Sequence, residues 1–328
     1  MQWTEKYRPK TLDDIASHNE VKSLLWNAQE TGNLPHLLFH GPPGTGKTSM
    51  ILAYCHSIFP GKLFNSRVME LNASDDRGIN VVREQITTFS KKAINNVYPP
   101  YKIIILDEVD AMTSDAQSAL RKIIEEFSSI TRFCLICNYI NNIISPIISR
   151  CVCFRFLPID KRSTMNKLQE ICVQEEIGIS NNIIEEIIDI SEGDLRKSIT
   201  FLQNIRYDLL CGSTIDEVIQ ENLMMMPDEL LEQIKDIILG HNCDIEDIMR
   251  LARHIIRMGY DDDNILASIT LLIINMDEID DIRKSGSIMY ISEIANKMKL
   301  RTNRFIQILG LLNKLSYNFE GGFQDYRL

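Results

Sequence analysis

The sequence predicts an α/β domain built on a parallel sheet, followed by two helical domains. Over residues 1–160, short apolar runs alternate with stretches of helical period, which is the pattern of a parallel sheet covered by helices. From Ile159 onward the chain changes to amphipathic helical segments, and Pro158 marks the boundary. We therefore expect domains at residues 1–159, 160–225 and 226–328.

Five short apolar runs are predicted as strands, and the last four begin about 30 residues apart, which leaves room for crossover helices. The predicted strands are residues 36–40, 67–71, 102–106, 132–137 and 152–156. Amphipathic helices are predicted at residues 161–178, 181–192 and 194–206, and the block from Pro227 onward is again helical in period.

The composition is typical of a soluble globular protein, with 328 residues of which 45% are hydrophobic and 24% charged. The charged N-terminal segment lacks the apolar core of a signal peptide. The longest apolar stretch, residues 265–276, contains Ser268 and Thr270 and is too short to cross a bilayer. These features argue against secretion and against membrane insertion.

The net charge of -10 is unevenly distributed along the chain. Residues 1–160 hold 17 Lys and Arg against 16 Asp and Glu, whereas residues 161–328 hold 18 against 29. Such a balance argues against a protein that coats polyanions in general, but it is compatible with a small basic DNA-binding patch in the first half.

A glycine-rich loop lies between a predicted strand and a predicted helix. Residues 41–48 read GPPGTGKT, a pattern whose backbone N–H groups turn toward phosphates at a helix N-terminus. We expect Lys47 to reach the β- and γ-phosphates of a nucleotide and the Thr48 hydroxyl to hold Mg²⁺. The expected nucleotide contacts in this loop are Gly41, Pro42, Pro43, Gly44, Thr45, Gly46, Lys47, Thr48 and Ser49.

Two acidic residues, Asp107 and Glu108, follow the apolar run at residues 103–106. The carboxyl ends of parallel strands are where open α/β sheets bind ligands. We expect Asp107 to complete the Mg²⁺ shell and Glu108 to orient and activate the attacking water. An acidic loop after a strand is common by itself, but together with the phosphate loop it predicts a nucleotide site that can hydrolyse its ligand.

Further sequence blocks accompany these two motifs. They read WTEKYRP (3–9), ELNASDDRGI (70–79), LDEVDAMT (106–113), FCLICN (133–138), SRC (149–151) and GDLRK (193–197). With the phosphate loop, they resemble the AAA+ ATPases and, more narrowly, the small subunits of replication factor C, the eukaryotic sliding-clamp loader. Archaeal and virus-encoded small subunits would look similar. The resemblance covers residues 3–206, whereas the C-terminal third is compatible only in length and helical period.

The resemblance implies an AAA+ P-loop domain, a helical lid domain and an all-α collar domain that assembles a heteropentamer. It implies an ATPase that uses ATP and Mg²⁺ to open a sliding clamp (PCNA) and load it at primer–template DNA during replication and repair. The implied partners are other replication factor C subunits, the clamp and DNA, but no membrane, and the implied location is the nucleus. The alternatives are another AAA+ DNA machine, such as a branch-migration helicase, and a ring subunit that does not hydrolyse ATP.

Three polar residues acquire roles from this resemblance. Asn138 matches the first sensor near the γ-phosphate, although Asn at a strand end is also a common turn former. Arg150 matches an arginine that acts in trans at a neighbouring subunit's ATP site, where a guanidinium suits phosphoryl oxygens; the alternative is a surface ion pair. Arg196 matches the second sensor, which contacts the γ-phosphate in cis; the alternative is a solvated helix charge.

The resemblance also assigns residues around the base, the water and the DNA. Thr4, Arg8 and Ala16 are expected on the adenine side, and Asn72 is expected to restrain Glu108 until DNA arrives. Arg77, Arg83 and Thr113, at the starts of two predicted helices, are candidate contacts to DNA phosphates, with Gln117 one turn after Thr113. The alternative is a solvated charged face. Ile86 and Phe89 match positions that touch the clamp, but they suit a core equally well.

Several patterns are interpreted as structural. Eight cysteines in apolar contexts suit buried free thiols, and neither Cys134-x-x-Cys137 nor Cys151-x-Cys153 has the partners of a metal site. Residues 224–226, three methionines, are expected to fill a core. Residues 261–263, three aspartates, lack the spacing of a calcium loop and are expected to start a helix.

Overall fold

The structure is a computed structural model that describes residues 2–15, 17–74, 79–92, 98–211, 226–239, 244–300 and 302–320. The chain forms two compact units, Met1–Gln203 and Asn204–Leu328. The expected boundary after residue 159 falls inside the first unit, and the one after residue 225 adjoins residues outside the described part. The division into three domains therefore stays a prediction.

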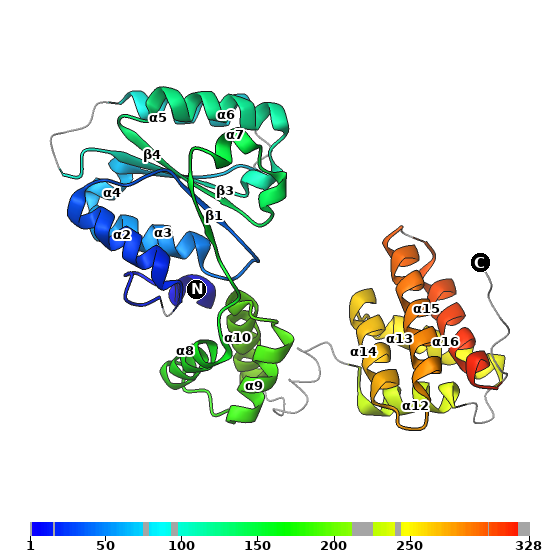
Figure 1. Ribbon diagram of the computed structural model, residues 1–328. Coiled ribbons are helices and arrows are strands. Elements are labelled where there is room, and N and C mark those ends of the chain that lie inside the picture. The colour runs from blue at the N-terminus through cyan, green and yellow to red at the C-terminus, as the bar shows by residue number, and fades with distance from the viewer. Residues whose placement is uncertain are drawn as a thin grey trace. The chain divides into compact units, whose positions relative to one another are not determined.

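The first unit is built around a five-stranded parallel sheet with the strand order β2-β3-β4-β1-β5 (Figure 1). All five predicted strands are confirmed, with ends that differ by one residue at most. The strands are β1 (Leu37–His40), β2 (Val68–Asn72), β3 (Lys102–Asp107), β4 (Thr131–Cys137) and β5 (Val152–Arg155).

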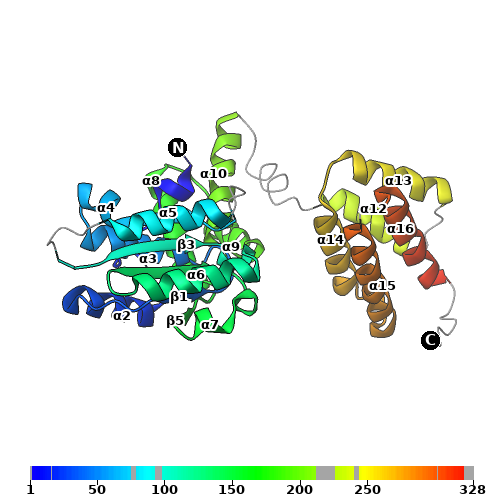
Figure 2. The same ribbon diagram turned by 90° about the horizontal axis from the view of Figure 1, so that it is seen from above.

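Helices cover both faces of this sheet, which explains why its central strands are apolar almost throughout. Leu37 and Phe39 of β1 belong to one core, and Leu38, between them, belongs to the core on the opposite face. Helices α2 and α3 lie on the first face, and α5 and α6 lie side by side on the second (Figures 1 and 2). The helical segments of this layer are α1 (Trp3–Lys6), α2 (Asn19–Thr31), α3 (Lys47–Ile58), α4 (Lys62–Arg67), α5 (Ile79–Lys91), α6 (Ser114–Phe127) and α7 (Ser145–Ile148), with 3-10 turns η1 (Val109–Ala111) and η2 (Ile140–Asn142).

Three helices, α8 (Lys161–Gln174), α9 (Asn181–Ile190) and α10 (Leu195–Cys211), follow the sheet, as expected from the helical period after Pro158. The first ends four residues earlier than predicted, because Glu175 closes it as the C-cap and Glu176 adopts a left-handed φ of 56°. The third begins one residue later than predicted and continues beyond residue 206.

The second unit contains α12 (Asp228–Ile238), α13 (Ile245–Arg257), α14 (Asp262–Asn275), α15 (Asp281–Lys299) and α16 (Arg304–Glu320). Their apolar faces share one core, in which Met226 is buried as expected. Asp261 is the N-cap of α14, which confirms the predicted helix start. Among the described residues, no helix has the length and apolarity needed to cross a membrane.

The expectation that the cysteines are buried is only partly correct. All seven cysteines in the described part are free, but Cys153 and Cys211 are exposed, because one lies on the edge strand β5 and the other at the last turn of α10. Cys134 and Cys137 lie in the central strand β4, and burial raises the pKa of the Cys137 thiol to about 12. Within the described ranges, no three His, Cys, Asp or Glu side chains form a metal-binding group.

Candidate active site

The phosphate loop connects β1 directly to α3. Gly44 and Gly46 adopt φ angles of 71° and 90°, in the left-handed region that a side chain strains, and Gly46 is the N-cap of α3. A Cβ on Gly46 would have no neighbour within 4 Å, so the loop leaves open space beside the helix N-terminus. That geometry directs the unpaired N–H groups of the first turn toward a concave pocket, as anion binding requires.

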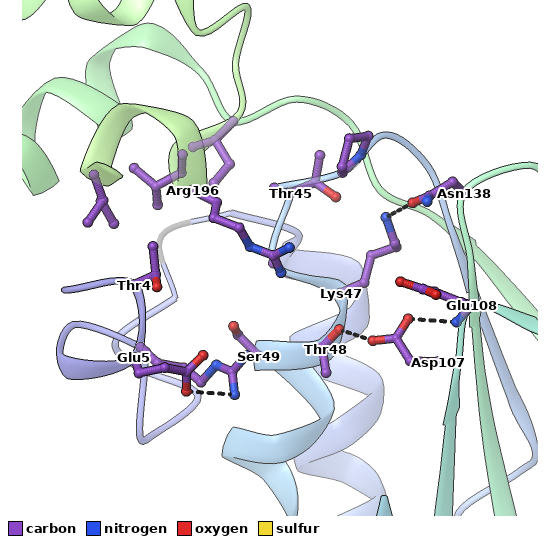
Figure 3. Close-up of a pocket in the computed structure, with 17 residues that line it drawn as sticks. Thr4, Glu5, Thr45, Lys47, Thr48, Ser49, Asp107, Glu108, Asn138 and Arg196 are labelled. Carbon is purple, nitrogen blue, oxygen red and sulfur yellow. Dashed lines mark hydrogen bonds and ion pairs between the residues drawn. The ribbon is translucent and has the colours of Figure 1, made fainter. Parts of the chain in front are cut away.

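In the part of the chain that the structure describes, seventeen residues from the sheet, the phosphate loop, the N-terminal segment and the α8–α10 region line this pocket (Figure 3). They include most of the predicted site residues and four that no motif assigned to the site, Glu5, Ile159, Leu195 and Ile199. The described residues that line it are Thr4, Glu5, Arg8, Pro43, Gly44, Thr45, Gly46, Lys47, Thr48, Ser49, Asp107, Glu108, Asn138, Ile159, Leu195, Arg196 and Ile199.

Lys47 is almost fully buried, and its ammonium is held by three oxygen acceptors. Nζ donates to the carbonyls of Gly41 and Pro42, both at 2.7 Å, and to Oδ1 of Asn138 at 2.9 Å. Burial lowers the pKa of Lys47 from its ordinary value, while the charge of Asp107 acts in the opposite direction. Gly41 and Pro42 are not among the described lining residues; they act on this site through the carbonyls that hold the lysine.

Thr48 and Asp107 are brought together although 59 positions separate them in the sequence. The Thr48 hydroxyl donates to Asp107 Oδ2 at 2.7 Å, and the backbone N–H of Glu108 donates to Asp107 Oδ1 at 2.8 Å. One hydroxyl and one carboxylate at this distance are hard oxygen donors of the kind that Mg²⁺ prefers. The donor set therefore fits the metal expected from the sequence.

Glu108 follows β3 in a left-handed conformation, with φ 56°, and its exposed side chain lines the pocket. Asn138 is positioned by Asp110, a residue to which no role was assigned from the sequence. Asp110 Oδ2 accepts hydrogen bonds from the backbone N–H groups of Asn138 and Tyr139, at 3.1 and 3.0 Å. Asn72 lies opposite Asp107 in the sheet register, and its Oδ1 accepts hydrogen bonds from Ser74.

Arg196 reaches the pocket from the first turn of α10, and in Figure 3 its guanidinium points toward the phosphate loop. Asp194 starts this helix, because its Oδ1 accepts hydrogen bonds from the N–H groups of Arg196 and Lys197 at 2.9 and 3.2 Å. The predicted helix start at residues 193–194 is thereby confirmed.

The N-terminal segment contacts both the pocket and the helices that follow the sheet. Thr4 and Arg8 line the pocket, and Glu5 pairs with Arg8 at 3.2 Å; the contact of Thr4 and Arg8 with adenine stays a prediction. On the other side of the segment, the Tyr7 hydroxyl donates to Glu175 Oε1 at 2.7 Å. Lys6 pairs with the same carboxylate, and the backbone N–H of Trp3 donates to Gln203 at 2.9 Å. Ala16, the third expected adenine contact, lies outside the described residues.

Arg150 is not among the described residues that line the pocket. It lies between α7 and β5, where its guanidinium pairs with Glu125 of α6 and donates to the carbonyl of Pro146 at 2.7 Å. Its side chain is 36% exposed, so it lies on the surface of the chain.

The structure describes only some of the candidate DNA contacts. Arg77 lies outside the described residues, and α5 includes Arg83, whose side chain is outside the described part. Thr113 is the N-cap of α6, and its side chain accepts from the Ala116 N–H. Gln117 is buried and holds the η2 loop through Asn142 and Ile144, so the expectation that it contacts DNA is wrong.

Of the two alternatives open for Ile86 and Phe89, clamp contact or core, the structure supports the core. They are 1% and 5% exposed and belong to the core between the sheet and α6.

Comparison with known proteins agrees with this geometry. Residues 37–159 match the family model of the ATPases associated with various cellular activities (AAA), and residues 166–206 match the RCF1/5-like AAA+ ATPase lid domain. Replication factor C subunit 2 of Saccharomyces cerevisiae is 39% identical, over 96% of this chain and 92% of that protein. The chain belongs to the replication factor C subunit family.

Other members of the family are similar over much or nearly all of the chain. Human replication factor C subunit 4 is 47% identical over 71% of this chain and 66% of that protein. A putative replication factor C small subunit of Acanthamoeba polyphaga mimivirus is 40% identical over 97% of this chain and 98% of that protein. As a member of this family, the chain is an ATP-hydrolysing AAA+ subunit of the clamp-loader type.

Among solved structures, the Holliday junction branch migration motor RuvB of Thermotoga maritima matches with a TM-score of 0.53 at 19% identity. The match covers 76% of this chain and 85% of that one. At this identity the likeness shows a shared AAA+ fold and does not extend to branch migration.

Proposed function

We propose that this subunit binds ATP with Mg²⁺ in the pocket and, within a heteropentamer, opens a sliding clamp such as PCNA and loads it at primer–template junctions. This work would belong to DNA replication and repair, and in a eukaryote it would take place in the nucleus. One observation carries the proposal: Lys47, Asp107, Glu108, Asn138 and Arg196 all line a single pocket, whereas the matching trans-acting arginine, Arg150, lies elsewhere on the surface.

ATP binding would exchange one set of hydrogen bonds for another. Lys47 donates to two carbonyls and an amide oxygen, and phosphate oxygens are stronger acceptors because they carry charge. The N–H groups around Gly44 and Gly46 would bind the β-phosphate at the start of α3. Thr4 and Arg8 would contact the base, with Glu5 holding Arg8 in place.

Thr48 and Asp107 would hold Mg²⁺, since their oxygens already lie 2.7 Å apart at the carboxyl end of β3. The metal would neutralise charge on the phosphate oxygens and orient them. Asp107 also accepts the N–H of Glu108 and thereby fixes the backbone that carries the proposed base.

For hydrolysis, Glu108 would accept a proton from the attacking water, which the Asn138 amide would help to position. Asp110 fixes the Asn138 loop, so it supports this step without touching the substrate. Arg196 would stabilise the γ-phosphate in cis, and Arg150 would stabilise the transferred phosphoryl group in the site of a neighbouring subunit.

The second unit supports assembly through apolar surface. The packed helices α14 and α15 leave Leu271, Ile274, Ile282 and Met289 between 48% and 73% exposed. Large apolar side chains exposed on two packed helices fit an interaction surface. We propose that residues 226–328 form the oligomerisation domain and residues 160–225 the lid, with residues 1–159 binding the nucleotide.

Contacts to DNA would be made through phosphates at the N-termini of α5 and α6. These helices pack side by side, and each follows the carboxyl end of a parallel strand, so both begin near the same edge of the sheet (Figure 2). Arg77, Arg83 and the N-cap residue Thr113 are the proposed contacts. Backbone contacts of this kind carry no sequence preference, as loading at any junction requires.

The test is the ATPase rate of the chain, alone and with candidate partner subunits, with and without primer–template DNA and a sliding clamp. Stimulation by DNA and clamp, lost in Lys47→Ala, would support clamp loading. Processive strand separation without a clamp effect would support a branch-migration motor. An unchanged complex ATPase in Glu108→Gln would instead support a subunit that does not hydrolyse ATP.

A further inference from the structure

The turn that precedes α10 packs against the phosphate loop through a single carboxylate. A Cβ built on Gly44 would lie 1.8 Å from Asp194 Oδ1 and 2.2 Å from its Cγ. The side chain of Asp194 therefore occupies the space that any side chain at position 44 would need. Both its positive φ and this contact favour glycine at position 44.

Asp194 is also the N-cap residue of α10, and it caps the helix through the same oxygen. Asp194 Oδ1 accepts the N–H groups of Arg196 and Lys197, at 2.9 and 3.2 Å, which are the second and third residues of the helix. A carboxylate here satisfies two unpaired donors and interacts favourably with the positive end of the helix dipole. One atom thus fixes the first turn of α10 and lies against the phosphate loop.

The turn that carries Asp194 is fixed on its other sides as well. Glu192 and Gly193 are consecutive residues with positive φ, 51° and 82°, and a Cβ on Gly193 would lie 2.7 Å from Cβ of Pro158. The backbone N–H of Asp194 donates to the carbonyl of Ser191, a buried residue, at 2.9 Å. The carboxylate is therefore held by a tight turn, and it does not hang from a flexible loop.

We infer that Asp194 is a positioning residue that sets the approach of Arg196 to the phosphate loop and so couples the lid to the γ-phosphate. The inference rests on the proposed function, because it takes Arg196 to contact the γ-phosphate. Asp194 acts through Arg196: it contacts Gly44 and the helix start, and the guanidinium two residues later enters the pocket. Without the carboxylate, the first turn of α10 loses both its N-cap and its packing contact with the phosphate loop.

The test measures equilibrium binding of ATPγS and of ADP to the full-length chain by calorimetry. Asp194→Ala should weaken ATPγS binding about fivefold, as expected for loss of an N-cap that positions a ligand group, and should change ADP binding less than twofold. Asp194→Asn keeps an oxygen acceptor at the same place and should restore ATPγS affinity to the wild-type value.

A matched control is available in the same region of the chain. Asp160 caps α8, where its side chain accepts the Ser163 N–H at 2.9 Å, but it is not among the described residues that line the pocket. Asp160→Ala should lower thermal stability about as much as Asp194→Ala and should leave the ATPγS-to-ADP affinity ratio unchanged. This variant separates a structural cap from a positioning role.

The double variant Asp194→Ala/Arg196→Ala decides whether the two residues act as one unit. If Asp194 acts through Arg196, the double variant should bind ATPγS no more weakly than Arg196→Ala alone. Effects that multiply, or an Asp194→Ala variant that loses ATPγS and ADP equally, would overturn the inference. A wild-type chain that binds neither nucleotide would contradict the proposed function itself, which is a different result.

Discussion

The nucleotide pocket and the surface around Arg150 belong to the same compact unit, but their polar groups are paired differently. In the pocket, Lys47 and Thr48 make hydrogen bonds to Asn138 and Asp107, so the groups proposed to act together already contact one another. At the surface, Arg150 pairs with Glu125, which has no part in the proposed chemistry and is itself 41% exposed.

This difference fits a chain that binds ATP in its own pocket and offers an arginine to a neighbouring subunit. The contacts proposed to bind ATP come from one chain and need no partner. Arg150 is held by an exposed carboxylate and by the carbonyl of Pro146. The ion pair restrains it weakly, because exposed ion pairs contribute about 0–1 kcal/mol. If Arg150 acts in trans as proposed, it can exchange Glu125 for the phosphates of another subunit at little cost, whereas Arg196 already lines the pocket of its own chain.

The largest expected effect is that of Glu108→Gln, which should lower the rate of hydrolysis without lowering ATP affinity. Glu108→Gln should lower the rate of hydrolysis at this subunit's own site in the assembled complex by about 10²- to 10⁴-fold, the usual contribution of a general base. ATP affinity should stay within about twofold, since the amide preserves shape and Glu108 is exposed at the pocket wall. Single-turnover hydrolysis and equilibrium binding measure the two quantities, and an equal loss in both would place Glu108 among the binding groups.

Lys47→Ala should act mainly on ATP binding. Loss of a charged donor that is buried among the loop carbonyls should weaken ATP binding by on the order of 100-fold. Thermal stability should fall as well, because Gly41 is buried and its carbonyl would lose a charged donor. Retained ATP affinity in this variant would break the assignment of the pocket as the phosphate site.

A smaller effect is expected where the N-terminal segment contacts Glu175. Glu175→Ala removes the acceptor of Tyr7 and Lys6 and should weaken ATP binding a few-fold, because Thr4 and Arg8 are carried by the same segment. Glu170→Ala, an exposed acid on α8 that pairs with Lys167, is the matched control and should have no effect. Equal ATP affinities of the two variants would show that the N-terminal segment does not depend on its contact with Glu175.

The smallest effect concerns the pair at the surface. Glu125→Ala should change the stability of the chain by less than about 1 kcal/mol, the range for exposed ion pairs. It should leave the ATP affinity of the isolated chain unchanged. A large loss of stability in thermal unfolding would mean that Arg150 is a structural residue and would remove the contrast between the two regions.

The sheet was predictable because both of its faces are buried. Runs such as residues 103–106 are continuous and apolar, so the strand ends could be placed within one residue. Helix ends were less predictable: α8 stops at Gln174 because of a cap and a left-handed residue that the apolar period does not reveal. The motifs also located the principal pocket residues, because each motif lies at a strand end or a helix start.

What could not be predicted depends on contacts between distant segments. The contact of Asp194 with Gly44 and the hydrogen bonds of Asp110 to the Asn138 loop exist only in the folded chain. Helical period alone left Ile86 open between core and surface, and only packing against α6 decides that it is core. Glu5 lies inside the WTEKYRP block, but sequence offers no signal that its carboxylate faces Arg8 and the pocket.

The central claim is that Arg150 serves a site in another subunit, and Arg150→Ala tests it most directly. The measurement compares ATP affinity of the isolated chain with the ATPase rate of the complex assembled with partner subunits, using Arg155→Ala on the same exposed strand region as the control. The account predicts unchanged ATP affinity and a complex that loses the hydrolysis of one site, while Arg155→Ala behaves as wild type. Weaker ATP binding by the isolated Arg150→Ala chain, with full activity of the complex, would contradict it.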